Sequence, residues 1–285
     1  MTRQMNIEVV SSAFGDLTIV EQLRPGGQGW VFKARTQDGQ DVALKIFDQT
    51  TNLAQRIEHE VDALRQLDSP YIVSLIDEGS RMIGQSEHRY TITQFIDGID
   101  LRRRLDEGPL SSTQARSLCR RMACAIRDLW NMRIVHRDIK PENILLDEGG
   151  KAVLIDLSIA KHLDRTTVTQ YGYTLGTRGY MSPEQARARQ ALTQKSDVFA
   201  LGVVIVESLT GHHPFSFNQR CIAVEPPRGL EEVKARDAVL GQLAERMVAT
   251  SPVRRPLASD VLAAIPEPSR EASIVSAEPP FQLGN

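Results

Sequence analysis

Several chemically active side chains lie within the short segment 136–143, which has the sequence HRDIKPEN. Asp138 could orient a hydroxyl group and accept its proton, and Lys140, two residues later, could neutralise the charge of a phosphate group. Asn143 could hold a metal ion. The apolar run 144–146 follows at once and predicts a strand that would fix this loop on a rigid support. A polar surface turn is the alternative interpretation of the segment.

A second candidate metal ligand follows closely in the chain. Asp156 ends the apolar run 152–155, which predicts a buried strand. A carboxylate in such a place costs free energy unless it is paired or binds a metal ion. Because Mg²⁺ prefers carboxylate and phosphate oxygens, the sequence predicts a Mg²⁺ site formed by Asn143 and Asp156, which Mn²⁺ could also use.

A lysine and a glutamate earlier in the chain complete the set of side chains that phosphoryl transfer needs. Lys45 ends the apolar segment 42–44 of a predicted strand, and Glu60 lies in the helical pattern 53–67. If this helix packs on that strand, an ion pair would hold Lys45 towards the α- and β-phosphates of a nucleotide. Taken singly, Lys45 could be a strand-end charge and Glu60 a solvated position on a helix.

A glycine cluster with the sequence PGGQG precedes Lys45 at 25–29. Gly26, Gly27 and Gly29 have no Cβ, so the backbone amides of this loop could approach a phosphate group closely. Taken alone, the cluster is more typical of a plain hairpin.

The hydrophobic pattern divides the chain into a β-rich first part and a mainly helical second part. The first part contains predicted strands in 17–36, 41–47, 71–77 and 89–95 and an amphipathic helix in 53–67. The second part contains predicted helices in 111–133, with Ser111 or Ser112 as N-cap, and in 195–210, 232–248 and 257–265.

We therefore expect an α+β fold with two lobes. The N-terminal lobe would span 14–95, with one main helix beside its sheet, and a hinge would lie at 95–98. The mainly helical C-terminal lobe would span 99–265. The stretch 266–285 is rich in proline and serine and is predicted to be a disordered tail.

Composition narrows the class of protein. The chain has 285 residues, 41% hydrophobic residues, 25% charged residues and a formal net charge of −2, which gives no support for nucleic-acid binding. Cys119, Cys124 and Cys221 have no metal-type spacing, and the first two lie in an apolar helical pattern typical of buried thiols in a reducing compartment. No signal-like segment or membrane-length apolar run is present, so we expect a cytoplasmic protein without a membrane partner.

A longer stretch of sequence carries a family resemblance. The segment 176–186, GTRGYMSPEQA, is similar to bacterial Ser/Thr kinases of the eukaryotic-like protein kinase family, and the resemblance covers roughly 14–265. Lys140 after the His-Arg-Asp triplet resembles Ser/Thr kinases, whereas tyrosine kinases usually differ there. The resemblance implies a protein-kinase-like fold that uses ATP and Mg²⁺ to phosphorylate serine or threonine hydroxyls of protein substrates, which the sequence does not identify.

The resemblance also implies roles for residues that spacing alone does not assign. Asp197 would accept hydrogen bonds from the backbone of the catalytic loop, and Thr177 would lie beside that loop and favour a hydroxyl substrate. Arg255 would pair with Glu184 in a buried bridge. The residues implied in binding adenine are Val31, Ala43 and Leu145, with Thr93 as gatekeeper and Gln94 and Ile96 as hinge residues.

Three departures from the family pattern motivate an alternative function. Arg24 replaces the first glycine of the phosphate loop, Gln28 replaces the aromatic residue at its tip, and Leu157-Ser158 replaces Phe-Gly after the metal aspartate. These changes would suit a pseudokinase that binds nucleotide and acts as an interaction module. The active enzyme is favoured because the chain has all six side chains that phosphoryl transfer needs: Lys45, Glu60, Asp138, Lys140, Asn143 and Asp156. A small-molecule kinase on the same fold is a third possibility.

The segment 156–184 is a candidate regulatory element. It is rich in hydroxyl side chains. Arg137 precedes the predicted base, and in kinases of the same pattern the arginine at this position binds a phosphate on this segment. We favour Thr169 as the phosphorylated residue, with Thr167 second. The hypothesis is autophosphorylation in trans between two copies of the chain, which a homodimer would bring together. A solvated loop is the alternative.

Two arginine runs, 102–104 and 120–121, could form a docking surface for an acidic partner. Solvated helix faces are the interpretation that we favour for both runs.

Overall fold

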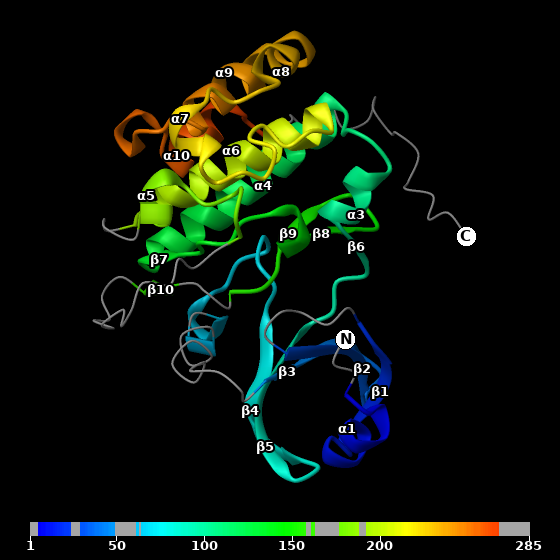
Figure 1. The fold of residues 1–285 in the computed structure, drawn as a ribbon. Coiled ribbons are helices and arrows are strands. Elements are labelled where there is room, and N and C mark those ends of the chain that lie inside the picture. The colour runs from blue at the N-terminus through cyan, green and yellow to red at the C-terminus, as the bar shows by residue number, and fades with distance from the viewer. Residues whose placement is uncertain are drawn as a thin grey trace. The chain divides into compact units, whose positions relative to one another are not determined.

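The structure is a computed structural model that describes residues 5–23, 29–48, 61–62, 64–157, 161–162, 177–187 and 192–267. It divides into two compact units (Figure 1). The first comprises Met1–Asp68 and Val73–Ile96, and the second comprises Ser69–Ile72 and Asp97–Asn285. The chain passes from the first unit to the second between Ile96 and Asp97, inside the predicted hinge 95–98.

The N-terminal unit is built on one antiparallel sheet. Its strands are β1 (Leu17–Gln22), β2 (Gly29–Thr36), β3 (Asp41–Phe47), β4 (Leu75–Ile83) and β5 (Ser86–Gln94), in the order β1-β2-β3-β5-β4. The predicted strand 71–77 is wrong in its bounds. Strand β4 starts later and runs further because β4 and β5 form a hairpin around Gly84, whose φ of 63° suits a residue without a Cβ.

One face of this sheet forms the core of the unit. Alternate residues of β2 and β3 are buried, as the period of a half-buried strand requires. A helix that the sequence did not predict, α1 (Ile7–Ala13), packs on the same core through the buried Val10. Phe14, which follows α1, contacts the ring of Tyr90 edge-on at a centroid distance of 5.0 Å.

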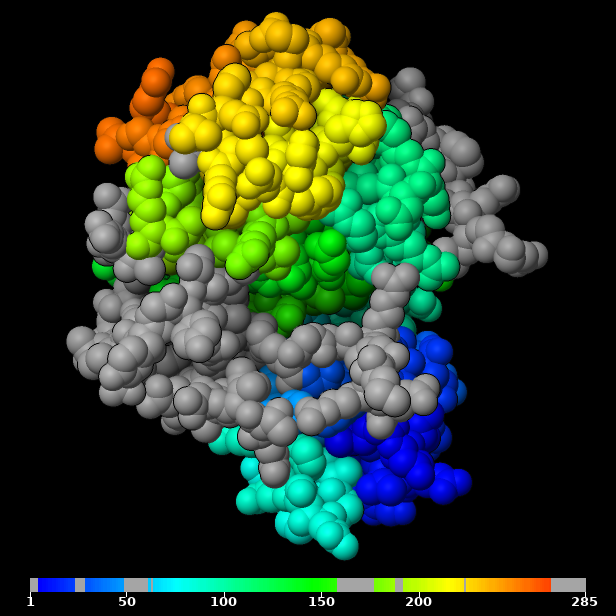
Figure 2. All heavy atoms as spheres, in the orientation of Figure 1, coloured from blue at the N-terminus to red at the C-terminus, as the bar shows by residue number. Residues whose placement is uncertain are grey.

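An ion pair fixes α1 beside the β4–β5 hairpin. Arg81 of β4 donates hydrogen bonds to both carboxylate oxygens of Asp16, at 2.5 and 2.9 Å, and to the carbonyl oxygen of Ala13. Its guanidinium group lies 4.6 Å from the centre of the Phe14 ring. The dark blue segment that contains α1 therefore adjoins the cyan hairpin on the surface of this unit (Figure 2).

The predicted helix 53–67 lies largely outside the described residues. Residues 61–62 and 64–66 are helical, and Val61 forms a small buried cluster with Phe47 of β3. The described end of this helix therefore contacts the strand on which the sequence placed it.

The second unit is mainly helical. Its α-helices are α3 (Leu101–Asp106), α4 (Ser112–Asn131), α5 (Pro183–Arg187), α6 (Gln194–Thr210), α7 (Cys221–Val224), α8 (Leu230–Arg236), α9 (Ala238–Met247) and α10 (Ala258–Ala264). Short strands and 3₁₀ turns connect them: β6 (Gly98–Asp100), β7 (Ile134–Val135), η1 (Pro141–Asn143), β8 (Ile144–Asp147), β9 (Ala152–Leu154), β10 (Lys161–His162) and η2 (Pro252–Arg254).

Local sequence signals set the ends of the long helices. Ser111 caps α4 in a capping box with Gln114, which confirms one of the two predicted N-caps. The predicted helix 232–248 is wrong as a single element. Asp237 divides it, because its backbone is extended and its side chain accepts the N–H of Leu240 as the N-cap of α9.

Helix α6 is the most buried element of the second unit. Every residue of Gln194–Thr210 except Lys195 is buried, and α4 and α9 both pack against it. It ends at Gly211, which adopts the left-handed conformation with φ of 73°. Within the described ranges, no helix combines the length and the apolar character that crossing a bilayer would require.

The contacts of Phe14 predict that α1 is part of the cooperative fold of the N-terminal unit. Because Phe14 is completely buried, Phe14→Ala should lower the free energy of unfolding by about 3–5 kcal/mol, measured by urea denaturation. Val20→Ala is the control, since Val20 is 47% exposed and its truncation should cost less than about 0.5 kcal/mol. Equal effects of the two changes would contradict the role of Phe14 in the core.

Candidate active site

The backbone of the segment 136–143 is held by a buried carboxylate on α6. Asp197 accepts the N–H groups of His136 and Arg137, each at 2.8 Å. This geometry confirms the hydrogen bonds that the family resemblance implied. Burial raises the pKa of Asp197 to about 7, and the two N–H donors oppose that rise.

His136 adds a second restraint on the same segment. Its ring is completely buried, and Nδ1 lies 3.2 Å from the backbone nitrogen of Asp138 and accepts its N–H. Burial lowers the pKa of His136, which favours the neutral ring that this hydrogen bond requires. Arg137 between them has a φ of 72°, a strained conformation that persists only where surrounding contacts impose it.

The carboxylate of Asp138 is surrounded by donors. Its Oδ1 accepts hydrogen bonds from the backbone N–H and the hydroxyl of Thr177, at 2.9 and 2.8 Å. Its Oδ2 lies 2.9 Å from Nζ of Lys140 and 3.1 Å from Nδ2 of Asn143. Lys140 also donates to the Thr177 hydroxyl at 2.6 Å. The structure therefore brings the predicted base, the predicted phosphate cation and Thr177 into one hydrogen-bonded group.

The two predicted metal ligands lie on neighbouring backbone segments. The N–H of Ile155, the residue before Asp156, donates to the carbonyl oxygen of Asn143 at 2.9 Å. Nδ2 of Asn143 is engaged by Asp138, so its amide oxygen is the atom that would face a cation. Asp156 has a φ of 66°, a second strained position at the site. An amide oxygen and a carboxylate are donors that fit Mg²⁺.

In the N-terminal unit, the candidate nucleotide residues share one face of the sheet. Lys45 pairs with Val31 on β2 and with Thr91 on β5, and Ala43 pairs with Thr93. Because cross-strand partners point to the same face, all five side chains lie opposite the buried core face. The ammonium group of Lys45 lies 4.8 Å from the centre of the Phe47 ring.

Gly29 has a structural reason to be glycine. A Cβ atom there would lie 2.0 Å from the carbonyl oxygen of Ile46 on β3, so only glycine allows this close pairing of β2 and β3. In the hinge, the N–H of Gln94 donates to the carbonyl of Ser74 at 2.9 Å, whereas Ile96 is half-buried. Leu145 lies in β8 of the second unit, paired with Val153. The predicted site residues Gly26, Gly27, Glu60, Thr167 and Thr169 lie outside the described residues.

A third set of contacts joins the segment 177–187 to the helices. Glu184 and Arg255 form a buried bidentate pair, with distances of 2.7 and 2.9 Å, which confirms the predicted bridge. Burial opposes ionisation of Glu184, but hydrogen bonds from Arg255 reverse this effect and lower the pKa of the carboxyl group. Gln185, a residue to which the sequence gave no role, donates to the carbonyl of Arg137 at 2.7 Å.

A family model described as the protein kinase domain matches residues 17–264 of this chain. The chain belongs to the protein kinase domain family. The two-lobed α+β fold predicted from the sequence is confirmed with it.

Bacterial proteins are among the similar relatives of this kinase domain. Serine/threonine-protein kinase PrkC of Bacillus subtilis is 38% identical over 180 residues, which cover 61% of this chain and 27% of the relative. Serine/threonine-protein kinase AfsK of Streptomyces griseus is 34% identical over 208 residues, 70% of this chain and 25% of the relative. Serine/threonine-protein kinase PknD of Mycobacterium tuberculosis is 34% identical over 212 residues, which cover 72% of this chain and 31% of the relative. The matched segment thus spans about a quarter to a third of each relative.

The prediction for the arginine run 102–104 is wrong at Arg102. This side chain is not solvated on a helix face but forms ion pairs with Glu142, at 3.0 Å, and with Glu207, at 2.9 Å. The other run is also engaged, since Arg120 donates to the carbonyl of Ile265 and Arg121 to that of Ala152. Glu207 was a usable signal, because a carboxylate in the apolar helical pattern 195–210 requires a buried partner.

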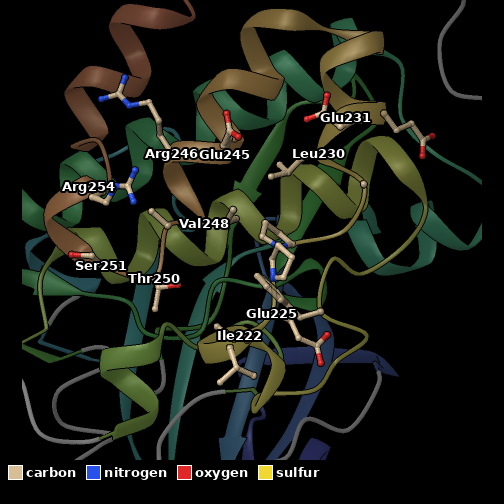
Figure 3. Close-up of a pocket in the computed structure, with 17 residues that line it drawn as sticks. Ile222, Glu225, Leu230, Glu231, Glu245, Arg246, Val248, Thr250, Ser251 and Arg254 are labelled. Atoms are coloured by element: carbon tan, nitrogen blue, oxygen red, sulfur yellow. The ribbon is translucent and has the colours of Figure 1, made fainter.

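A separate hollow of about 890 Å³ lies on the helical unit (Figure 3). Residues of α7, α8, α9 and η2 line it, among them Leu230, Val248 and Arg254. Its lining includes none of the residues that surround Asp138, so it is distinct from the candidate active site.

The Glu184–Arg255 pair should be a major determinant of the stability of the kinase domain. Arg255→Met should lower the free energy of unfolding by about 3–5 kcal/mol, because it leaves the Glu184 carboxylate buried without its cation. Arg236→Met is the matched control, since Arg236 pairs with Glu232 at 2.9 Å on the surface of α8 and should contribute about 0.5 kcal/mol. Chemical denaturation measures both, and a loss below about 1 kcal/mol for Arg255→Met would contradict the role of the pair.

Proposed function

We propose that this domain transfers the γ-phosphoryl group of ATP to serine or threonine hydroxyls of protein substrates. The observation that carries the proposal is the Asp138 carboxylate, held by Thr177, Lys140 and Asn143 in one hydrogen-bonded group. The names of the relatives support the same reaction. The activity and substrates of the whole protein are part of this proposal, because the relatives are much longer than the matched segment.

In the proposed reaction, the substrate hydroxyl donates its hydrogen to the carboxylate of Asp138. The oxygen of that hydroxyl attacks the γ-phosphorus, the bond to the β-phosphate oxygen of ATP breaks, and the proton passes to Asp138. Lys140, 2.9 Å from the same carboxylate, neutralises charge that develops on the transferred group. The four donor groups that Thr177, Lys140 and Asn143 supply to Asp138 fix its orientation before the substrate binds, which lowers the cost of reaching the reactive geometry.

We propose the following residues for nucleotide binding. Lys45 is the proposed phosphate cation and Glu60 is its proposed ion-pair partner. The glycines Gly26, Gly27 and Gly29 form the proposed phosphate loop. Asn143 and Asp156 are the proposed ligands of Mg²⁺, which would neutralise phosphate charge when bound. The proposed adenine contacts are Val31, Ala43, Thr93, Gln94, Ile96 and Leu145.

The pseudokinase alternative is not favoured. A domain that only binds nucleotide has no physical requirement for a carboxylate surrounded by a lysine, a threonine and an asparagine. The contacts of Asp138 are those expected of a base that must be oriented.

Removal of the proposed base gives a direct test. Asp138→Asn should reduce the rate of phosphate transfer by at least about 100-fold and leave ATP affinity within about twofold, because the amide cannot accept the proton but adds no bulk. Asp106→Asn, the same change at the exposed end of α3, is the control and should keep full activity. Transfer of ³²P from ATP and nucleotide titration measure the two quantities. Undiminished transfer by Asp138→Asn would overturn the proposal.

We further propose that Thr169, with Thr167 second, is phosphorylated in trans by another copy of the chain. Arg137 supports this, because its guanidinium is largely buried with a pKa that desolvation lowers, so an added phosphate would supply a matching charge. Thr169→Ala should then lower the transfer rate of Mg·ATP-treated protein by at least about tenfold without changing ATP affinity. Thr167→Ala is the comparison, and mass spectrometry identifies the labelled residue. Equal rates for wild type and Thr169→Ala, after treatment with a phosphatase and then with ATP, would exclude Thr169.

We propose a cytoplasmic location for the domain. Cys119 and Cys124 are buried free thiols, which suit a reducing compartment. Burial raises the pKa of Cys119 to about 12, so this thiol is unreactive at neutral pH.

A further inference from the structure

Arg102 joins three elements of the helical unit and the turn before α5 in one polar cluster. From α3, its Nε donates to Glu142 of η1 at 3.0 Å, and its Nη1 donates to Oε1 of Glu207 on α6 at 2.9 Å. Its Nη2 donates to the hydroxyl oxygen of Tyr180 at 2.5 Å. The Tyr180 hydroxyl in turn donates to Oε2 of Glu207 at 2.5 Å. We call these four residues the Arg102 cluster.

Arg102 supplies the positive charge that balances the buried carboxylate of Glu207. The side chain of Glu207 is 4% exposed, and both of its carboxylate oxygens accept a hydrogen bond within the cluster. Burial, together with the neighbouring Glu207 carboxylate, raises the pKa of Tyr180, so the phenol keeps its proton and stays a donor. Without Arg102, Glu207 would be a buried carboxylate with only this neutral partner, which is a costly state.

The cluster lies beside the position of the acceptor hydroxyl. Glu142 directly precedes Asn143, whose side chain donates to Asp138. Tyr180 follows three residues after Thr177, which donates to the other Asp138 oxygen. Because each extended residue advances about 3.3 Å, a substrate segment whose hydroxyl reaches Asp138 has residues within reach of Glu142 and Tyr180.

Two carboxylates beside the acceptor would ordinarily attract a basic side chain of the substrate. Here the chain supplies the cation itself. Both oxygens of Glu207 already accept a hydrogen bond within the cluster, and the charge of Glu207 is matched by Arg102. Glu142, whose side chain is 46% exposed, would meet an incoming cation in water, where an ion pair is weak. The incoming group would also face the positive charge of Arg102.

Arg102 lies beside one exposed aromatic ring and polar groups of both charges. The ring of Phe217 is 52% exposed and lies 5.8 Å from the guanidinium group. A hollow of about 680 Å³ adjoins the cluster and is lined by Arg102, Phe217, His213 and Arg228, among others. Arg102 and Arg228 balance the charges of Glu207 and Glu232 in this lining, so the hollow offers a cationic side chain no net attraction, whereas a neutral or apolar side chain can pack on the Phe217 ring.

We propose that Arg102 occupies, from within the chain, a subsite that Glu142 and Glu207 would otherwise offer to a basic residue of the substrate. The domain then accepts serine or threonine segments that carry a neutral or apolar residue at this subsite. This inference names the substrate class of the proposed kinase reaction and rests on that proposed function.

The test compares wild type with Arg102→Ala on a set of threonine peptides. Arginine is placed in turn at each position from four before to four after the threonine, with leucine and alanine at the same positions as references. Wild type should use the arginine peptides no better than the leucine peptides. Arg102→Ala should prefer arginine at one position by at least about fivefold in kcat/KM, because the peptide cation takes the place of Arg102 between the Glu142 and Glu207 carboxylates.

Control variants isolate the proposed subsite. Arg103→Ala removes the same charge from an exposed position of the same helix and should keep the wild-type profile. The double variant with Arg102→Ala and Glu142→Gln should lose most of the new preference. Arg102→Lys keeps a cation but not the planar group that bonds three acceptors. This variant should therefore prefer arginine peptides less strongly than Arg102→Ala does. Because it keeps a charged partner for Glu207, it provides a second measurement if the alanine variant does not fold.

A melting experiment tests the subsite without phosphate transfer. Argininamide should raise the melting temperature of Arg102→Ala, which has a vacant cation position, more than that of wild type or of the double variant. Equal shifts in all three proteins would overturn the inference.

Two further outcomes would also overturn the inference. In the first, wild type prefers the arginine peptides by about fivefold and Glu142→Gln removes this preference. In the second, Arg102→Ala folds but does not prefer arginine at any position. Absence of transfer by wild type to every peptide and to its own chain would instead remove the proposed function. The melting experiment would still report on the subsite in that case.

Discussion

The organisation of the helical unit depends on the burial of charge along α6. This helix carries Asp197 in its first turn and Glu207 ten residues later, about 15 Å along its axis. Neither carboxylate can be solvated, so each must obtain donors from other elements. Asp197 obtains them from the backbone of His136 and Arg137, and Glu207 obtains them from Tyr180 and Arg102. The same physical requirement therefore positions the loop that carries the proposed base, Asp138, and the segment that contains Thr177 and Tyr180.

Elements with a strong local signal could be predicted from the sequence. Helix α4 and strand β3 follow directly from the period of their apolar residues. Helix α6, which is buried on all sides, follows from the length of its largely apolar run. Helix α1 could not be predicted, because a helix of seven residues depends on tertiary contacts such as those of Val10 rather than on propensity. The division of 232–248 was missed for a different reason. Asp237 is compatible with a helix interior by composition, and only its capping bond to Leu240 shows that a new helix begins.

Contacts of the candidate site were easier to predict when the two residues lie close together in the sequence. Asp138, Lys140 and Asn143 are neighbours in sequence, so spacing alone suggested their cooperation. Thr177 contacts Asp138 across 39 residues and was anticipated only through the family resemblance. Arg102 contacts Glu207 across 105 residues, and neither spacing nor resemblance indicated it. A charged residue in a polar run has no sequence signature that distinguishes a solvated position from a buried partner.

Arg255 and Arg102 show how one residue type serves two different physical purposes. Arg255 is buried and donates five hydrogen bonds, two to Glu184 and three to backbone carbonyls, so no donor remains for any other task. It fixes the fold. Arg102 is 23% exposed, donates to three side chains and borders an open hollow. Its backbone lies on a short helix, and its partners lie in the segment 136–143, in the segment 177–187 and on α6. A change of this one side chain would alter the charge presented to a substrate while Asp138 kept all of its own donors, so recognition can vary without a change in the chemistry.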